Sequence, residues 1–115
     1  MAFFVVVHHK RDQDQPWKNH WLDDDRLQVI ETTEDIAARC AEAQRRGERV
    51  FVHRCGWLGG PPMVCCSVAI KNARHGSNLG WVEFHDPVIL DIPPTVQPGR
   101  GQNCYDAPPP VSATV

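Results

Sequence analysis

The clearest pattern of hydrophobic and polar positions in the chain is that of an amphipathic helix over residues 33–46. Ile36, Cys40 and Ala43 recur at intervals of four and three residues, which places them on one helical face. A threonine can cap the amino end, acidic residues follow in the first turn, and two arginines precede Gly47. The narrow face of small side chains predicts close packing of this helix against a sheet.

Most of the remaining chain consists of short apolar or alternating runs that predict β-strands. The predicted strands are, in chain order, residues 2–7, 27–31, 48–55, 63–70, 81–85 and 88–92. Glycine and proline predict loops at 56–62 and 72–78, and Pro87 predicts an interruption between the last two strands. Residues 93–105 are too rich in Pro and Gly for a regular element.

These elements predict a single α+β domain over residues 1–105. Its expected architecture is a bent mixed β-sheet or pseudo-barrel packed against one main amphipathic helix. A length of 115 residues with 42% apolar composition falls in the usual range of a single domain, which buries roughly two-thirds of the surface of its unfolded chain. Residues 106–115 contain three consecutive prolines and predict a disordered Pro-rich tail.

Composition and charge narrow the class of protein. The apolar run at residues 2–7 is shorter than the core of a signal peptide, about 7–15 residues, or a membrane span, about 20. We therefore expect a soluble cytoplasmic protein without a membrane partner. The formal net charge of −2 argues against a protein that holds nucleic acid by bulk electrostatics alone.

The sequence offers few signals of metal binding or catalysis. Its five cysteines are odd in number and lack the CxxC spacing of a zinc site, and its six histidines are scattered. We expect reduced thiols, no metal site and no cofactor. The motifs of serine hydrolases, P-loop nucleotidases and zinc deaminases are absent from the sequence. The question of enzymatic activity stays open, and these observations favour a protein that is not an enzyme.

Several short phrases of the sequence occur in an order that is typical of one superfamily. The phrases are Phe3-Phe4-Val5-Val6-Val7, Gly47-Glu48-Arg49-Val50-Phe51-Val52-His53, Pro61-Pro62-Met63-Val64, Trp81-Val82-Glu83-Phe84 and Pro87-Val88-Ile89-Leu90. Over about residues 3–92 the chain resembles the PUA-like superfamily, and within it the EVE and ASCH domains. The Pro- and Gly-rich segment after residue 92 departs from that pattern.

The resemblance implies a pseudo-barrel with a concave face that accepts a modified base flipped out of DNA, or a feature of RNA. Such a pocket needs aromatic side chains for stacking and polar groups for the edge of the base. The aromatic candidates for ligand binding are Trp57, Trp17, Trp21 and Trp81. For each of them a core position is the alternative, and this alternative is strongest for Trp81 because it begins a predicted strand.

The polar candidates for ligand binding are His8, His9, Lys10 and Arg54. The first three follow the first strand, where PUA-like relatives often place ligand contacts. The alternative for His8 and His9 is a pair of strand-end histidines with local hydrogen bonds. The alternative for Arg54 is a charged side chain on a solvated strand edge. The expected function is a nucleic-acid-binding module that reads a modified base or an RNA feature.

Two other functions remain open. Some ASCH relatives are small amidohydrolases that use a lysine and a carboxylate, and Lys10 with Glu83 would be such a pair for a modified nucleoside. The Pro-rich tail agrees equally well with a protein-partner module of a defence or phage system. The sequence does not determine the base, the choice between DNA and RNA, or the oligomeric state.

Overall fold

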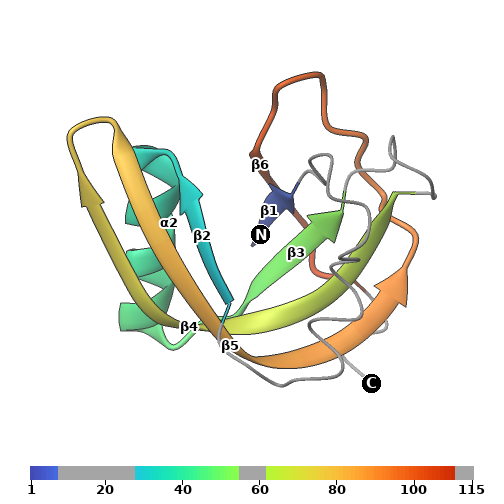
Figure 1. The fold of residues 1–115 in the computed structure, drawn as a ribbon. Helices are drawn as coiled ribbons and strands as arrows, with labels where there is room; N and C mark the ends of the chain where they lie inside the picture. Colours follow the sequence, from blue (N-terminus) through green and yellow to red (C-terminus); the bar gives the residue numbers. More distant parts are fainter. Residues whose placement is uncertain (8–27, 55–61, 111–115) are drawn as a thin grey trace.

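A single curled β-sheet with one helix makes up the described part of the chain (Figure 1). The structure is a computed structural model that describes residues 1–7, 28–54 and 62–110. The strands are β1 (Ala2–Val7), β2 (Gln28–Thr32), β3 (Val50–Arg54), β4 (Met63–Gly76), β5 (Leu79–Ile92) and β6 (Cys104–Ala107), and the helix is α2 (Glu34–Arg46). The sheet order is β2-β5-β4-β3-β1-β6.

The sheet is mixed and strongly bent, as the sequence predicted. Strands β1 and β3 are parallel, and every other neighbouring pair is antiparallel. The two long strands β4 and β5 curl together around the molecule and give the sheet the form of a half-barrel (Figure 1). A bent α+β sheet with one main helix is therefore confirmed. Within the described residues, no helix combines the length and the apolar composition that a membrane span requires.

Helix α2 begins and ends where the sequence places it. The hydroxyl of Thr33 accepts a hydrogen bond from the backbone N–H of Ile36 at 3.3 Å, which caps the amino end. Gly47 adopts a left-handed conformation with φ of 68°, and its N–H donates to backbone carbonyls of the last turn. These local signals lie within a few residues of each helix end, so the sequence alone identified them.

The prediction of a loop at residues 72–78 is wrong. Strand β4 continues to Gly76, and only Ser77 and Asn78 form the turn to β5. Polar residues fill this part of β4 because one face of the hairpin is exposed to solvent, so they resemble a loop in sequence.

The predicted interruption at Pro87 is also wrong, because β5 runs through it. Among the described strands, β2 pairs only with the β5 residues from Gly80 to Phe84. At Pro87 no described strand lies on that side of β5, so the missing N–H breaks no described sheet pairing there. Asp86 and Asp91, with positive φ of 55° and 50°, lie where the register of β5 shifts against β4.

Strand β6 was not predicted, and it corrects the boundary of the tail. The expected limit of the domain at residue 105 falls inside β6, so Asp106 and Ala107 belong to the sheet. The strand pairs antiparallel with β1, with Tyr105 opposite Phe4. Its pairing partner lies about a hundred residues away in sequence, and a local pattern cannot show such a contact.

The sheet buries apolar side chains on both faces. The helix covers the inner face, where buried residues of α2 pack against alternate residues of β1, β3, β4 and β5. The second cluster lies on the other face of β1, β3, β4 and β6 and consists of Phe4, Val6, Phe51, Val64, Tyr105 and Ala107. Residues that alternate along one strand therefore contribute to two different hydrophobic clusters.

Candidate functional site

The end of the β4–β5 hairpin is held against the amino end of α2. The left-handed conformation of Asn78, with φ of 66°, closes the two-residue turn, and asparagine tolerates this conformation well. The N–H of Asn78 donates to Glu34 Oε1 at 3.4 Å, and His75 Nδ1 lies 3.8 Å from Glu34 Oε2. These contacts join the turn of the hairpin to the first turn of the helix.

Gly80 allows the helix to approach the inner face of the hairpin closely. A Cβ atom at this position would lie 2.4 Å from Ala37 Cβ and 2.7 Å from the carbonyl oxygen of Thr33. Side chains alternate along β5, so Val82 and Phe84 share the helix-covered face with Gly80, while Trp81 and Glu83 point the opposite way. The position of the helix therefore determines which face of the hairpin remains available.

We call the side of β2, β5 and β4 opposite α2 the outer face of the hairpin. Its central row consists of three register partners, Glu31 on β2, Trp81 on β5 and Arg74 on β4. The side chain of Trp81 is 39% exposed, which is unusual for the largest apolar side chain. Leu79, the next residue of β5 on this face, is also exposed.

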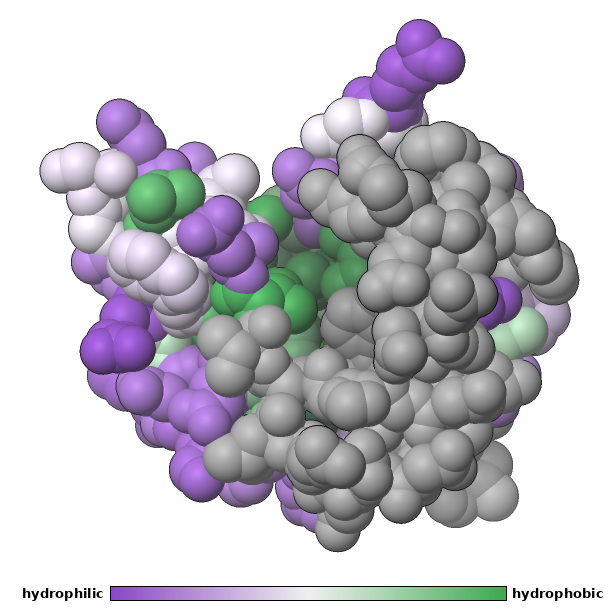
Figure 2. All heavy atoms as spheres, viewed as in Figure 1, coloured by the Kyte–Doolittle hydropathy of each residue, from purple (hydrophilic) through white to green (hydrophobic). Residues whose placement is uncertain are grey.

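The composition of the outer face suits contact with a flat, polar ligand. The indole of Trp81 offers a flat surface for stacking, and Arg74 offers guanidinium donors on the neighbouring strand. Glu31 and Glu83 balance this cation, so the outer face carries no strongly basic field. Figure 2 shows the hairpin as a lobe of mainly hydrophilic surface, beside a hollow that exposes hydrophobic residues.

The structure describes two of the eight predicted ligand-binding residues. Trp81 lies on the outer face, and its exposure shows that the alternative of a core tryptophan is wrong. Arg54 is the last residue of β3, partly buried, at the carboxyl end of the parallel pair. The other six predicted ligand-binding residues lie outside the described residues; they are Trp57, Trp17, Trp21, His8, His9 and Lys10.

The described strands that precede those six residues in sequence end at neighbouring points. The described part of β1 ends at Val7 and that of β3 ends at Arg54, and these two residues are register partners in the parallel pair. The catalytic pair proposed for an amidohydrolase is described only at Glu83, on the outer face, because Lys10 lies outside the described residues. In the described ranges, no group of three His, Cys, Asp or Glu side chains is arranged to hold a metal ion.

A buried polar pair next to Arg54 was missed by the sequence reasoning. His53 is 1% exposed, and its Nδ1 lies 2.7 Å from the hydroxyl of Tyr105 on β6. The Tyr105 ring stacks on Phe4 with ring centres 4.7 Å apart, and Phe51 stacks on the opposite side of Phe4 at 5.0 Å. Burial raises the pKa of Tyr105 to about 12, so its hydroxyl stays protonated at neutral pH.

The sequence signal from which part of this pair could be recognised is the position of His53 at an alternating site of a strongly apolar strand. Its partner was not recognisable, because residues 93–105 gave no strand signal. The pair links β3 to β6 across the intervening strand β1 by a hydrogen bond between buried groups. We assign it a structural role at the end of the sheet where Arg54 lies.

Comparison with known proteins assigns neither a family nor a site. The chain matches no protein-family model, no curated protein and no solved structure. The similarity to EVE and ASCH domains therefore remains a prediction from the strand pattern.

Proposed function

We propose that the chain is a nucleic-acid-binding module that stacks an unpaired base on Trp81. The observation that carries this proposal is the exposed indole of Trp81 on the outer face, with Arg74 as its cross-strand neighbour. Base stacking on an aromatic side chain contributes about 1–3 kcal/mol per base and works for any base. An exposed tryptophan on a sheet face thus gains most from a ligand that is itself flat and aromatic.

The arrangement of charge favours an unpaired strand over a duplex. A base in a duplex is stacked and paired, so its face is not accessible without a cost of a few kcal/mol for flipping. The net charge of −2 and the balance of Arg74 by Glu31 also give little attraction for the dense charge of a duplex. We infer that single-stranded DNA or RNA, or an unpaired loop, is the ligand of the outer face.

The more specific part of the proposal is that the chain recognises a modified base or an RNA feature in an aromatic pocket. It rests on the resemblance to EVE and ASCH domains and on the register pairing of Val7 with Arg54, because the candidate residues follow these two positions in the sequence or include Arg54 itself. In this proposal Trp17, Trp21 and Trp57 form aromatic walls, and His8, His9, Lys10 and Arg54 contact the edge of the base. Trp81 then binds a flanking nucleotide.

The proposal is tested by the affinity of a labelled strand of about ten nucleotides, which spans one typical binding site. Fluorescence anisotropy would be measured for DNA and RNA, with and without modified cytosine or adenine. Trp81→Ala should weaken binding about 5- to 150-fold through loss of stacking, while Trp81→Phe should retain most of the affinity. With one or two phosphates neutralised, affinity should fall less than about tenfold between 50 and 200 mM salt.

The chain offers a matched control for Trp81. Ile89 lies on the same strand and is equally exposed, 39%, but it is distant in sequence from the hairpin turn. Ile89→Ala should therefore leave the affinity unchanged within about twofold, in the range of ordinary surface substitutions. Equal affinities of the wild type and Trp81→Ala for every strand, or no saturable binding at low salt, would refute the proposal.

A further inference from the structure

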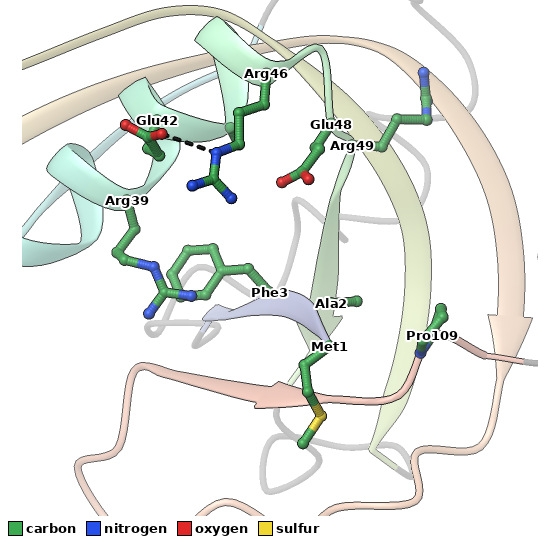
Figure 3. Close-up of a pocket in the computed structure, with 10 residues that line it drawn as sticks. Met1, Ala2, Phe3, Arg39, Glu42, Arg46, Glu48, Arg49 and Pro109 are labelled. Atoms are coloured by element: carbon green, nitrogen blue, oxygen red, sulfur yellow. Dashed lines mark hydrogen bonds and ion pairs between the residues drawn. The ribbon is translucent and has the colours of Figure 1, made fainter.

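A cavity of about 490 Å³ lies between α2 and the amino ends of β1 and β3 (Figure 3). This volume falls in the range of small-molecule sites, about 300–1,000 Å³. The charged side chains that line the cavity are Arg39, Glu42, Arg46, Glu48 and Arg49, and Phe3 is its largest apolar side chain. None of these residues belongs to the outer face of the hairpin.

Arg39 is held in a defined position at one side of the cavity. Its guanidinium lies 4.2 Å above the ring of Phe3, and its Nη2 donates to Asp106 Oδ1 at 2.6 Å. A second, weaker contact joins Nη1 to Oδ2 at 3.4 Å. The hydrogen bond to Asp106 raises the pKa of Arg39 further, so the cation is permanent. These contacts lower the entropy that the side chain would lose on binding a ligand.

Arg46 is oriented in a similar way two helical turns later. Its Nε donates to Glu42 Oε2 at 2.9 Å, and its two terminal amino groups point into the cavity (Figure 3). Arg45 also bonds to Glu42 but does not line the cavity. Hydrogen bonding to Arg45, with the charges of Arg45 and Arg46, keeps the pKa of Glu42 below its usual value. Glu42 therefore remains an anion that orients Arg46.

The two other charged residues have different orientations. The guanidinium of Arg49 points away from the cavity, where it donates to the hydroxyl and the carbonyl of Ser67, and only its stem lines the wall (Figure 3). The carboxylate of Glu48 points toward the cavity, and no residue in the described ranges forms a hydrogen bond or ion pair with it (Figure 3). The cavity thus presents fork donors from one side and an acceptor from the other.

We propose that this cavity binds a phosphomonoester, with the phosphate at the two terminal amino groups of Arg46 and another donor group of the same molecule at Glu48. Arg39, whose terminal amino groups already bind Asp106, is a second cation of the cavity wall. A guanidinium matches phosphate because two parallel N–H groups can bond two phosphate oxygens. Glu48 repels an isolated phosphate ion, but it accepts a hydrogen bond from a sugar hydroxyl or a base amino group. The ligand class is therefore a nucleotide or a sugar phosphate.

Calorimetric titration of the full chain with AMP, ribose 5-phosphate, adenosine and inorganic phosphate tests the proposal. AMP or ribose 5-phosphate should saturate the site, whereas adenosine should not bind. Arg46→Gln should weaken binding about tenfold or more, the usual consequence of losing a charge-assisted hydrogen bond. Glu48→Ala should shift the preference from the ester toward inorganic phosphate, because it removes the acceptor that only the ester uses together with a charge that repels the phosphate of both ligands.

Arg45→Gln is the matched control, since it removes the same charge from the same turn and the same partner, Glu42. It should change the affinity less than about twofold. Arg45 is exposed and lies outside the site, so salt screens the effect of its charge on a bound phosphate. Equal losses in Arg45→Gln and Arg46→Gln would overturn the proposal. So would the absence of saturation by every phosphomonoester up to about 10 mM at low salt, a concentration that corresponds to negligible affinity.

The phosphate can belong to a free molecule or to the 5′ end of a nucleic-acid strand. A strand of about ten nucleotides, with either a 5′-phosphate or a 5′-hydroxyl, distinguishes these sources when it is titrated into Trp81→Ala. A gain with the 5′-phosphate that Arg46→Gln abolishes assigns the site to strand ends. Equal affinities together with AMP binding assign it to free molecules. AMP binding that persists in Trp81→Ala separates this site from the function proposed for the outer face.

Discussion

Replacement of Gly80 by alanine should destabilise the protein through the contact between hairpin and helix. The new methyl group would lie 2.4 Å from Ala37 Cβ and 2.7 Å from the carbonyl oxygen of Thr33. Carbon atoms in contact are normally about 3.5–4.0 Å apart, so the helix and β5 must separate by about 1 Å. Neither obstacle is flexible, because Ala37 is fully buried and Thr33 caps the helix.

The expected cost follows from two opposing effects. Overpacking of a closely packed contact costs about 1–3 kcal/mol. Alanine restricts the unfolded chain more than glycine does, which returns about 0.4–1 kcal/mol. We expect a net loss of about 1–2 kcal/mol in the free energy of unfolding, which corresponds to about 4–10 °C in the melting temperature.

Gly76→Ala is the control for this prediction. A Cβ atom at Gly76 meets nothing within 4 Å, so only the effect on the unfolded chain remains. Urea unfolding followed by circular dichroism should give midpoints in the order Gly76→Ala, wild type, Gly80→Ala, from most to least stable. If Gly80→Ala unfolds at the wild-type midpoint, the close packing of α2 on β5 is not as the structure shows it. Partial recovery of stability in Gly80→Ala on adding Ala37→Gly would identify the methyl contact as the cause.

Two further predictions concern buried groups. Tyr105→Phe keeps the ring against Phe4 but removes the hydroxyl next to His53 Nδ1, so unfolding in urea should show a loss of about 1–3 kcal/mol; an unchanged midpoint would exclude a stabilising role. Burial raises the pKa of Cys40 and Cys66 from 9.0 to about 12. Because the pKa of each thiol is higher in the folded chain than in the unfolded chain, the stability of the fold depends on pH. The contribution of the two thiols to the free energy of unfolding is complete below pH 9 and is lost as the pH rises toward 12. At pH 8 iodoacetamide should modify both thiols only after unfolding, which mass spectrometry can measure. Alkylation of either thiol in the native protein would contradict this prediction.

The parts of the fold that were predictable from sequence have local causes. Helix α2 was recognisable because Thr33, Gly47 and the apolar face all lie within one segment of the chain. The extension of β4 to Gly76 was not, because its exposed residues have the composition of a loop and form a strand only by pairing with β5. Strand β6 depends on β1 in the same way.

The candidate sites show the same limit. The sequence identified Trp81 as a possible ligand contact, but its exposure depends on which face of β5 the helix covers, and Gly80 decides this. The cavity was not predicted, because Phe3 on β1, Arg39 on α2 and Glu48 between α2 and β3 are distant in sequence and carry no motif. Only the pairing of β1 with β3, and the position of α2 on the sheet, bring these residues together.

The central claim is that an unpaired strand binds the outer face of the hairpin through Trp81. NMR of the ¹⁵N-labelled chain during titration with a single strand of about ten nucleotides tests it most directly. We predict that the indole N–H of Trp81 and the amides of residues 72–76 and 79–83 shift progressively, while those of the second cluster around Tyr105 do not. Shifts that leave Trp81 and the hairpin unchanged, or no shifts at any strand concentration, would contradict the proposed function.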